Sequence, residues 1–308
     1  MQKHSNAHPR NGTQTNELDI SPGATARKRL RSYWSLIKSL QTGLLLMTGV
    51  AGYFSAHEAM RWGDLLGLLP SLFLAISGST ILNMWWDRGI DAKMKRTHMR
   101  PVPSGDVSTR EVLALGLVTS ILGVGWALLL DARYGLAVFA GLFFDVVVYT
   151  MWLKRRTCWS IVWGGIAGAM PVLSGRVLAV HRLDAIGILL AAAILFWIPT
   201  HTLTFSMKFF EDYQAAGVPT FPSTYGERFT RLTIATASIL AGAAMIVASI
   251  WIGVAEGILA LIIILSGVLL FLAATVVLRP SDKTNLRLYK YASLYMLCTM
   301  LLIIPTKL

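Results

Sequence analysis

Charged residues are scarce in this chain, and acidic residues are the scarcest of them. Only 14% of its 308 residues are charged and 55% are hydrophobic, whereas about 25% of the residues in soluble domains are charged. This balance excludes a water-soluble globule, a disordered chain and a coiled coil. Cysteine is nearly absent too: Cys158 and Cys298 are too few for a disulfide framework or a cysteine metal cluster.

The few charges that are present have a positive excess. The chain has 28 lysines and arginines against 16 aspartates and glutamates, which gives a net charge of +12. In a soluble protein this excess would indicate nucleic acid as a partner. In a chain with a mean hydropathy of +0.58, it indicates orientation in a lipid bilayer, and no nucleic-acid partner is expected.

Long apolar runs alternate with short charged breaks along the chain. A transmembrane helix needs about 20 mainly apolar residues, and only helices and closed barrels satisfy their backbone groups in lipid. Nine runs are long enough: 34–56, 64–86, 112–131, 134–153, 160–178, 184–206, 229–252, 257–278 and 288–306. We therefore predict an all-α membrane protein, with a bundle of nine transmembrane helices in residues 31–308.

Residues 1–30 have a different composition. They are rich in Asn, Thr, Ser, Pro and Gly and hold almost no large apolar side chains, which is typical of a disordered tail. The first apolar run is too long for a secretory signal, and Glu17 and Asp19 argue against a mitochondrial transit peptide. We expect the cell membrane of a bacterial-type cell, in preference to the mitochondrial inner membrane.

The basic residues indicate how the chain is oriented. With a cytoplasmic N-terminus, 23 lysines and arginines fall on the cytoplasmic side and five on the other. Cytoplasmic loops carry such an excess, so we predict the N-terminus inside and, after nine spans, the C-terminus outside. The two long loops, 87–110 and 208–228, then share the cytoplasmic face.

The first of these loops combines carboxylates with cations. Asn83, Asp87 and Asp91 are spaced by four, so on a continuing helix they lie along one face. Mg²⁺ binds through few carboxylates together with substrate phosphates, and these oxygens suit it. The loop also supplies cations that suit a diphosphate: Arg88, Lys95, Arg96 and Arg100. The alternative interpretation is a solvated helix end with i,i+4 charge pairs.

The second loop begins on a predicted helix. His201 and Lys208 fall on about the same face, and the acidic pair Glu211 and Asp212 follows. A histidine near a helix end is more often a hydrogen-bonded structural residue than a ligand. The acidic pair and the Gly-Pro punctuation of residues 217–222 favour a binding site that the loop closes.

Four motifs in order then resemble a known family. They are NxxxDxxxD followed by KMKRTxxRPxPSG (83–105), YTMWLKRRT (149–157), GGxxGAxP with a later glycine (164–175), and H…K…EDYxxAGVP (201–219). Together they resemble the UbiA-type membrane prenyltransferases. The EDYxxAGVP stretch is similar to one branch of that family, the protohaem IX farnesyltransferases.

The resemblance implies Mg²⁺-assisted transfer of a farnesyl group from farnesyl diphosphate to a vinyl group of haem B, with water addition, to give haem O. Asp87, Asp91, Asn83 and Asp212 would hold Mg²⁺, with Glu211 beside them. The implied diphosphate cations are Arg88, Lys95, Arg96, Arg100, Lys154 and Arg155. Trp86 and Tyr149 would face the prenyl cation, and His201 and Lys208 would contact haem. A haem A synthase or an oxidase assembly is the implied protein partner.

The chain departs from the family pattern at several positions. Lys38-Ser39 stands for a Lys-Pro, Cys158-Trp-Ser160 for a Pro-x-Asn, Arg176 for a Trp, and Thr200 and Thr202 flank His201. The changes around His201 affect the porphyrin pocket and not the diphosphate site. Asp145 has no counterpart in the pattern. It either faces the cavity with Tyr149 or is hydrated near a helix end.

Two alternatives differ from haem farnesylation. The acceptor could be another aromatic compound or a lipid, against which the EDYxxAGVP loop argues. A transporter is more remote, because the sequence lacks paired inverted halves and its acidic groups lie at one face, away from the midplane.

Overall fold

The computed structural model describes residues 22–56 and 60–304, and every regular element in this part of the chain is a helix. The elements are α1 (Pro22–Leu36), α2 (Ser39–Phe54), α3 (Trp62–Asp91), α4 (Thr109–Leu130), α5 (Ala132–Phe143), the π-helix η1 (Phe144–Leu153), α6 (Ser160–Val180), α7 (Ala185–Lys208), α8 (Phe210–Ala215), α9 (Phe221–Ile252), α10 (Glu256–Leu278) and α11 (Asp282–Ile303). Most of the predicted tail lies outside the described residues, and its end, 22–30, belongs to α1.

Eight helices of the described chain are long and apolar enough to cross a membrane, which confirms eight of the nine predicted runs. They are Trp62–Asp91, Thr109–Leu130, Ala132–Leu153, Ser160–Val180, Ala185–Lys208, Phe221–Ile252, Glu256–Leu278 and Asp282–Ile303. The third of these contains both α5 and η1. The chain is therefore a multi-pass membrane protein.

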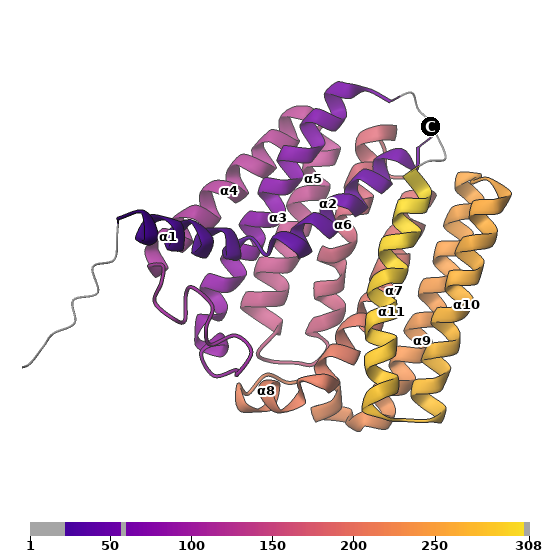
Figure 1. Cartoon of the computed structure of the whole chain (residues 1–308). Helices are drawn as coiled ribbons and strands as arrows, with labels where there is room; N and C mark the ends of the chain where they lie inside the picture. Colours follow the sequence, from indigo (N-terminus) through magenta and orange to yellow (C-terminus); the bar gives the residue numbers. More distant parts are fainter. Residues whose placement is uncertain (1–21, 57–59, 305–308) are drawn as a thin grey trace, which may run out of the picture.

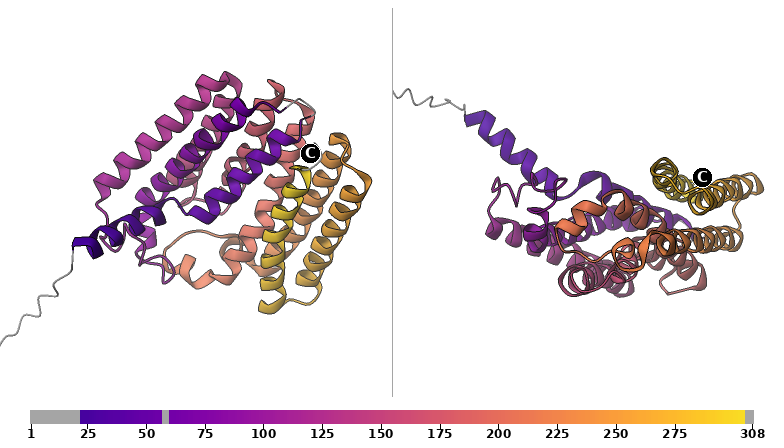
Figure 2. Two further views of the ribbon diagram at one scale, coloured as in Figure 1. Left: turned by 45° about the horizontal axis from the view of Figure 1, so that its top comes forward. Right: turned by 90° about the horizontal axis from the view of Figure 1, so that it is seen from below.

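The first predicted run, 34–56, differs from the expectation. The helix breaks at Lys38, which has a φ of 44°, and α2 begins at Ser39. With its 16 residues, α2 is about 24 Å long at 1.5 Å per residue, shorter than the hydrocarbon core of about 30 Å. The charged helix α1 projects from the bundle (Figures 1 and 2). A ninth complete span stays a prediction.

The two long loops lie at one end of the bundle, at the bottom of Figure 1, where α8 also lies. We call this end the loop end. Ile90 and Met94 from the first loop pack against Tyr213, Ala216 and Val218 from the second. The prediction that the two loops share a face is therefore confirmed, and the carboxyl ends of α3 and α7 meet there.

Small residues allow neighbouring helices to approach closely, as is common in membrane bundles. A Cβ atom on Gly175 of α6 would overlap the carbonyl oxygen of Gly49 in α2, and one on Gly52 would overlap that of Val172. In the same way, a Cβ on Gly123 of α4 would overlap the backbone of Ala75 in α3. These contacts fix α2 and α3 against their neighbours and so set where the end of α3 lies.

A buried arginine joins three helices at the end of the bundle opposite the loops. Arg176 of α6 is 5% exposed. Its guanidinium donates to the carbonyl of Ser55 and, at 2.7 Å, to Asp184, whose carboxylate also caps α7 at Gly187. Burial raises the pKa of Asp184, but Arg176 and the Gly187 N–H outweigh it, so this pKa lies below its usual value. Arg176, which stands where the family pattern has a Trp, thus has a structural role in this chain.

We expect Gly175→Ala to destabilise the bundle by about 1–3 kcal/mol, because the added methyl group forces α2 and α6 apart. Gly125→Ala is the matched control. A Cβ on Gly125 meets no atom within 4 Å, and alanine in a helix interior is favoured by about 0.5–1 kcal/mol. Thermal unfolding in detergent checks both, and equal midpoints for the two variants would contradict the packing argument.

Candidate active site

The carboxyl end of α3 carries the predicted carboxylates. The helix continues to Asp91, so Asn83, Asp87 and Asp91 follow one another along one face, as their spacing predicts. Asp87 and Asp91 are only 5% and 4% exposed. Buried carboxylates need partners, because an unpaired charge in a protein interior is strongly unfavourable.

Two of the predicted diphosphate cations are those partners. Lys154, which follows η1, donates to Asp87 Oδ2. Arg100, from the loop after α3, contacts both oxygens of Asp91, at 2.9 and 2.8 Å. Burial of the ammonium lowers the pKa of Lys154, but Tyr149 and Asp87 outweigh it, so the pKa lies above its usual value. Lys154 therefore stays charged at neutral pH.

One carboxylate oxygen in this cluster has no hydrogen-bond partner. Asp87 Oδ1 is buried and accepts no hydrogen bond, although it lies 3.9 Å from the Arg155 guanidinium. A hard cation such as Mg²⁺ would satisfy this oxygen, and Asn83 and Asp91 lie one turn away on either side. The residues at the end of α3 thus fit a magnesium ion.

The second acidic pair faces this cluster without joining it. Asp212 Oδ2 accepts from the backbone N–H of Arg96 at 3.4 Å, and Glu211 is exposed. Across the described residues, no group of three or more His, Cys, Asp or Glu is gathered closely enough to hold a metal. The contribution of Glu211 and Asp212 to the metal site stays a prediction.

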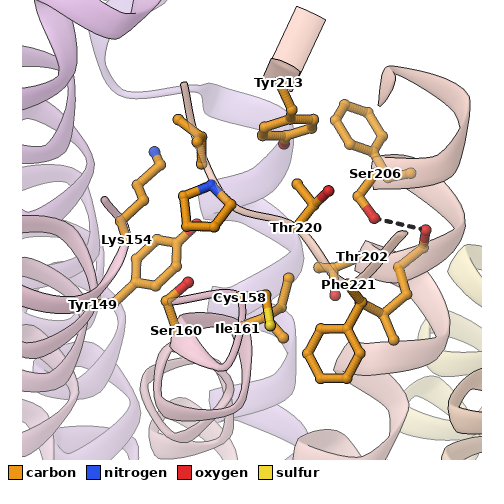
Figure 3. A pocket seen from close by; sticks show the side chains of 14 residues that line it. Tyr149, Lys154, Cys158, Ser160, Ile161, Thr202, Ser206, Tyr213, Thr220 and Phe221 are labelled. Carbon is orange, nitrogen blue, oxygen red and sulfur yellow. Dashed lines mark hydrogen bonds between the residues drawn. The ribbon is translucent and has the colours of Figure 1, made fainter. Parts of the chain in front are cut away.

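A cavity of about 100 Å³ lies beside Lys154, between η1, α6, α7 and the second loop. Figure 3 shows Tyr149 and Lys154 at one side of it and Ser206 and Phe221 at the other. Small-molecule sites usually have about 300–1,000 Å³, so this cavity holds only part of a substrate. Tyr149 lines this cavity, and its ring is 5.5 Å from Lys154 Nζ; its contact with the prenyl cation stays a prediction.

Three other predicted residues surround a separate hollow of about 270 Å³ at the surface, lined by Trp85, Trp86, Arg88, Gly89 and Arg155. Arg88 lies over Trp85 and donates to its carbonyl oxygen at 2.7 Å. Arg155 lies over Trp86 in the same manner, with a bond of 3.1 Å. Arg88 and Trp86 are therefore apart from the cavity, whereas Arg155 lies between the hollow and Asp87.

The remaining predicted cations lie in the loops. The Arg96 guanidinium sits over the rings of Phe205 and Phe209, at 5.0 and 5.4 Å from their centres. Lys208 is exposed and lies over Phe209 at 5.1 Å. Lys95 is exposed. Since all three are at the loop end, they add positive charge around the mouth of the site.

His201 is enclosed on both ring faces. It stacks between Trp197 and Tyr289, with ring centres 5.1 and 4.8 Å apart, and its Nδ1 is 3.1 Å from the hydroxyl of Ser293. Only the ring edge at Nε2 is left for a ligand. The haem contact predicted for His201 stays a prediction, and any such contact would be through that edge.

Sequence reasoning missed Ser79 and Thr150 as members of this cluster, did not place Lys38 in it, and left the role of Asp145 open. Ser79 and Asp145 bond to each other, and Asp145 and Thr150 both bond to the Asn83 amide. Lys38, at the break before α2, interacts electrostatically with Arg100, Lys154, Asp145 and Asp91. The signal in the sequence was the presence of Lys38 and Asp145 within long, mainly apolar runs, because ionisable groups inside membrane spans are rare and usually functional.

Comparison with known proteins assigns this arrangement to a family. The UbiA prenyltransferase family matches residues 44–297. This chain belongs to that family. It is therefore a prenyltransferase of the membrane.

Curated relatives of this prenyltransferase have a common name. A protohaem IX farnesyltransferase of Archaeoglobus fulgidus is 41% identical over 271 residues, which cover 87% of this chain and 94% of the relative. One from Korarchaeum cryptofilum is 43% identical over 209 residues, which cover 68% of this chain and 71% of the relative.

Solved structures agree on the fold. A digeranylgeranylglyceryl phosphate synthase superimposes with a TM-score of 0.75 at 19% identity, over 90% of this chain and 97% of that one. A UbiA homologue from Archaeoglobus fulgidus, bound to GPP and Mg²⁺, gives a TM-score of 0.65 at 18% identity, over 90% and 99%. The helical bundle is therefore the UbiA fold.

The ion pair at Asp87 generates a stability prediction. We expect Lys154→Met to lower the free energy of unfolding by about 3–5 kcal/mol, because it leaves the Asp87 carboxylate buried without its hydrogen-bonded counter-ion. The double variant Asp87→Asn/Lys154→Met should recover most of the loss. Unfolding in detergent at neutral pH measures all three proteins.

Arg155→Met is the control for this cycle. Arg155 is 3.9 Å from Asp87 and its side chain is 47% exposed, so its loss should lower stability by less than about 1 kcal/mol. A double variant no more stable than Lys154→Met alone would contradict the pairing.

Proposed function

We propose that this enzyme transfers the farnesyl group of farnesyl diphosphate to a vinyl group of haem B, with addition of water, and releases haem O and diphosphate. The observation that carries the proposal is the paired clamp at the end of α3. In it Lys154 and Arg100 hold Asp87 and Asp91, and one buried oxygen of Asp87 has no hydrogen-bond partner. The 41% identity to a protohaem IX farnesyltransferase, over most of both chains, supports haem as the acceptor.

The reaction separates charge. The bond between the allylic carbon of farnesyl and the diphosphate oxygen breaks, leaving negative charge on diphosphate and positive charge on the prenyl carbon. A vinyl carbon of haem attacks that carbon and forms the new carbon–carbon bond. Water then adds to the resulting cation beside the porphyrin ring and loses a proton, which gives the hydroxyethylfarnesyl side chain.

The carboxylates and cations at the loop end would bind the diphosphate. Asn83, Asp87, Asp91 and Asp212, with Glu211 beside them, would hold Mg²⁺. When bound, the metal supplies Lewis-acid neutralisation of the leaving diphosphate. Arg100 and Lys154 pair with the carboxylates in the structure and would donate to phosphate oxygens once a metal takes their place. Further donors around the same end are Lys95, Arg96 and Arg155.

The cavity walls would protect the prenyl cation. Tyr149, Phe205 and Tyr213 line the cavity, and the faces of aromatic rings attract cations. A site closed by two packed loops keeps water from the allylic carbon until the acceptor reacts. Trp86 lies at the surface hollow, so Tyr149 is the better candidate for this role.

The acceptor is too large for the cavity, so it would approach from the side of α7 and α11. The Nε2 edge of His201 would meet haem, while Arg96 and Lys208 at the loop end would meet its propionates. In a cell membrane with the loop end cytoplasmic and the C-terminus outside, the site lies at the inner leaflet. The apolar product would pass to a haem A synthase or an oxidase assembly. Residues 31–308 would form one transferase domain.

The decisive assay uses purified protein in detergent with haem B, farnesyl diphosphate and Mg²⁺, followed by mass spectrometry of the extracted haems. Haem O should form with the wild type. Asp87→Asn and Asp212→Asn should lower its rate by about 100-fold or more, because each removes a carboxylate that would hold the Mg²⁺ needed to neutralise the leaving diphosphate. The control is Asp282→Asn, an exposed carboxylate of α11, which should retain activity.

If no haem product forms while diphosphate is released with another aromatic or lipid acceptor, haem is the wrong acceptor and the prenyltransferase remains. If no prenylated product forms and no diphosphate is released with any acceptor, the clamp does not act on prenyl diphosphates.

Metal removal gives a separate test of the clamp. EDTA should stop turnover, and excess Mg²⁺ should restore it, since the leaving diphosphate needs a counter-charge. Asp91→Asn should require about tenfold more Mg²⁺ for half-maximal rate, because an amide is a weaker ligand than a carboxylate. Turnover that is unchanged in EDTA would contradict a metal at this site.

A further inference from the structure

Asp145 lies in η1, inside the mainly apolar span Ala132–Leu153. Its Oδ2 accepts two hydrogen bonds, from Ser79 Oγ at 2.5 Å and from Asn83 Nδ2 at 2.8 Å. Both donors come from α3. A carboxylate within a membrane span is expensive and is usually functional, and the reaction described above does not use this one.

The contact with Asp145 decides which way the Asn83 amide points. A carboxylate only accepts hydrogen bonds, so the NH₂ group of Asn83 must face it. The amide oxygen is then turned to the other side, where Thr150 Oγ1 donates to Asn83 Oδ1 at 2.5 Å. This oxygen has a second lone pair. The amide is thus held in one of its two orientations, with its oxygen still able to bind a cation.

The π-helix is what brings these side chains to α3. Asp145, Thr150 and Lys154 contact Ser79, Asn83 and Asp87, which are spaced by four along α3. In an α-helix, residues nine apart are separated by about two and a half turns, so Asp145 and Lys154 would point in opposite directions. The wider i→i+5 winding aligns them, as in the bond from the Lys154 N–H to the Tyr149 carbonyl.

The row of contacts between α3 and the segment from Asp145 to Lys154 therefore serves two purposes. Its outer contact, Lys154 to Asp87, supplies a cation and a carboxylate of the clamp. Its inner contacts, from Asp145 and Thr150, hold the third oxygen ligand of the same row. π-Helical segments are rare and are frequently found at functional sites, which agrees with selection for this alignment.

We propose that Asp145 is a positioning residue, which fixes the side-chain amide of Asn83 so that its oxygen is presented to the metal–diphosphate site. The inference rests on the proposed function in one respect, that Asn83 is a metal ligand. Asp145 would act through Asn83 and would not itself bind the metal. Partners that orient metal ligands typically change metal affinity by about 10–100-fold when they are removed.

Binding of Mn²⁺ in the presence of inorganic diphosphate, measured by electron paramagnetic resonance on the full-length protein in detergent, tests this directly. Asp145→Val removes the acceptor and should raise the Mn²⁺ dissociation constant about tenfold or more. Ser79→Ala is the matched control. It removes the other bond to Asp145 and keeps the bond to Asn83, so its dissociation constant should stay within about twofold of the wild type.

A double-mutant cycle separates positioning from direct ligation. If Asp145 acts through Asn83, the double variant Asn83→Ala/Asp145→Val should bind Mn²⁺ no more weakly than Asn83→Ala alone. Losses that multiply would make Asp145 a ligand in its own right and would overturn the inference. An unchanged dissociation constant with a lower unfolding temperature for Asp145→Val would also overturn it, because the contact would then be a structural tie only.

The same proteins distinguish this inference from the proposed function. If the wild-type protein binds Mn²⁺ with diphosphate but forms no haem O, haem B is not the acceptor. The double-mutant cycle then still tests the role of Asp145. Wild-type protein without measurable Mn²⁺ affinity would overturn both.

Discussion

The buried ion pair between Asp87 and Lys154 is the contact on which the rest of the site depends. It joins the carboxyl end of α3 to the end of η1, two segments that the sequence separates widely. Either charge alone at this depth would be strongly unfavourable, so the two helices must meet at this register. Once they do, Asn83 and Asp91 lie one turn to either side of Asp87. The same contact therefore stabilises the fold and assembles the clamp.

The π-helix follows from that register. A regular α-helix through residues 144–153 could direct either Asp145 or Lys154 at α3, but not both. The wider winding gives up the normal i→i+4 bonding and in return makes polar contacts at Ser79, Asn83 and Asp87. Inside an apolar span those contacts are worth more than regular geometry, because a carboxylate facing lipid without partners would be far more costly.

Apolar packing between the two long loops, and not the buried ion pairs, closes the site. The two loops adhere through Ile90, Met94 and Val218, while Arg96 lies over the rings of Phe205 and Phe209. Positive charge is thus concentrated at Lys154 and around the mouth of the cavity, while aromatic and aliphatic side chains make up much of the cavity wall. This distribution suits a substrate with an anionic head and an apolar chain, and it explains why so many cations occur in loops that contribute few buried ion pairs.

The sequence by itself determined eight spans, the common face of the two long loops and the row of Asn83, Asp87 and Asp91, because hydropathy and helical spacing are local properties. It also carried the family motifs. Only the tertiary structure decided that α1 ends before Lys38, that residues 144–153 form a π-helix, and that Lys154 meets Asp87 while Arg88 lies at the surface over Trp85. Those outcomes depend on how each helix is rotated against its neighbours. That rotation is set by close packing at glycines such as Gly49 and Gly175 and by the need to pair buried charges, and both are properties of contacts between segments far apart in the chain.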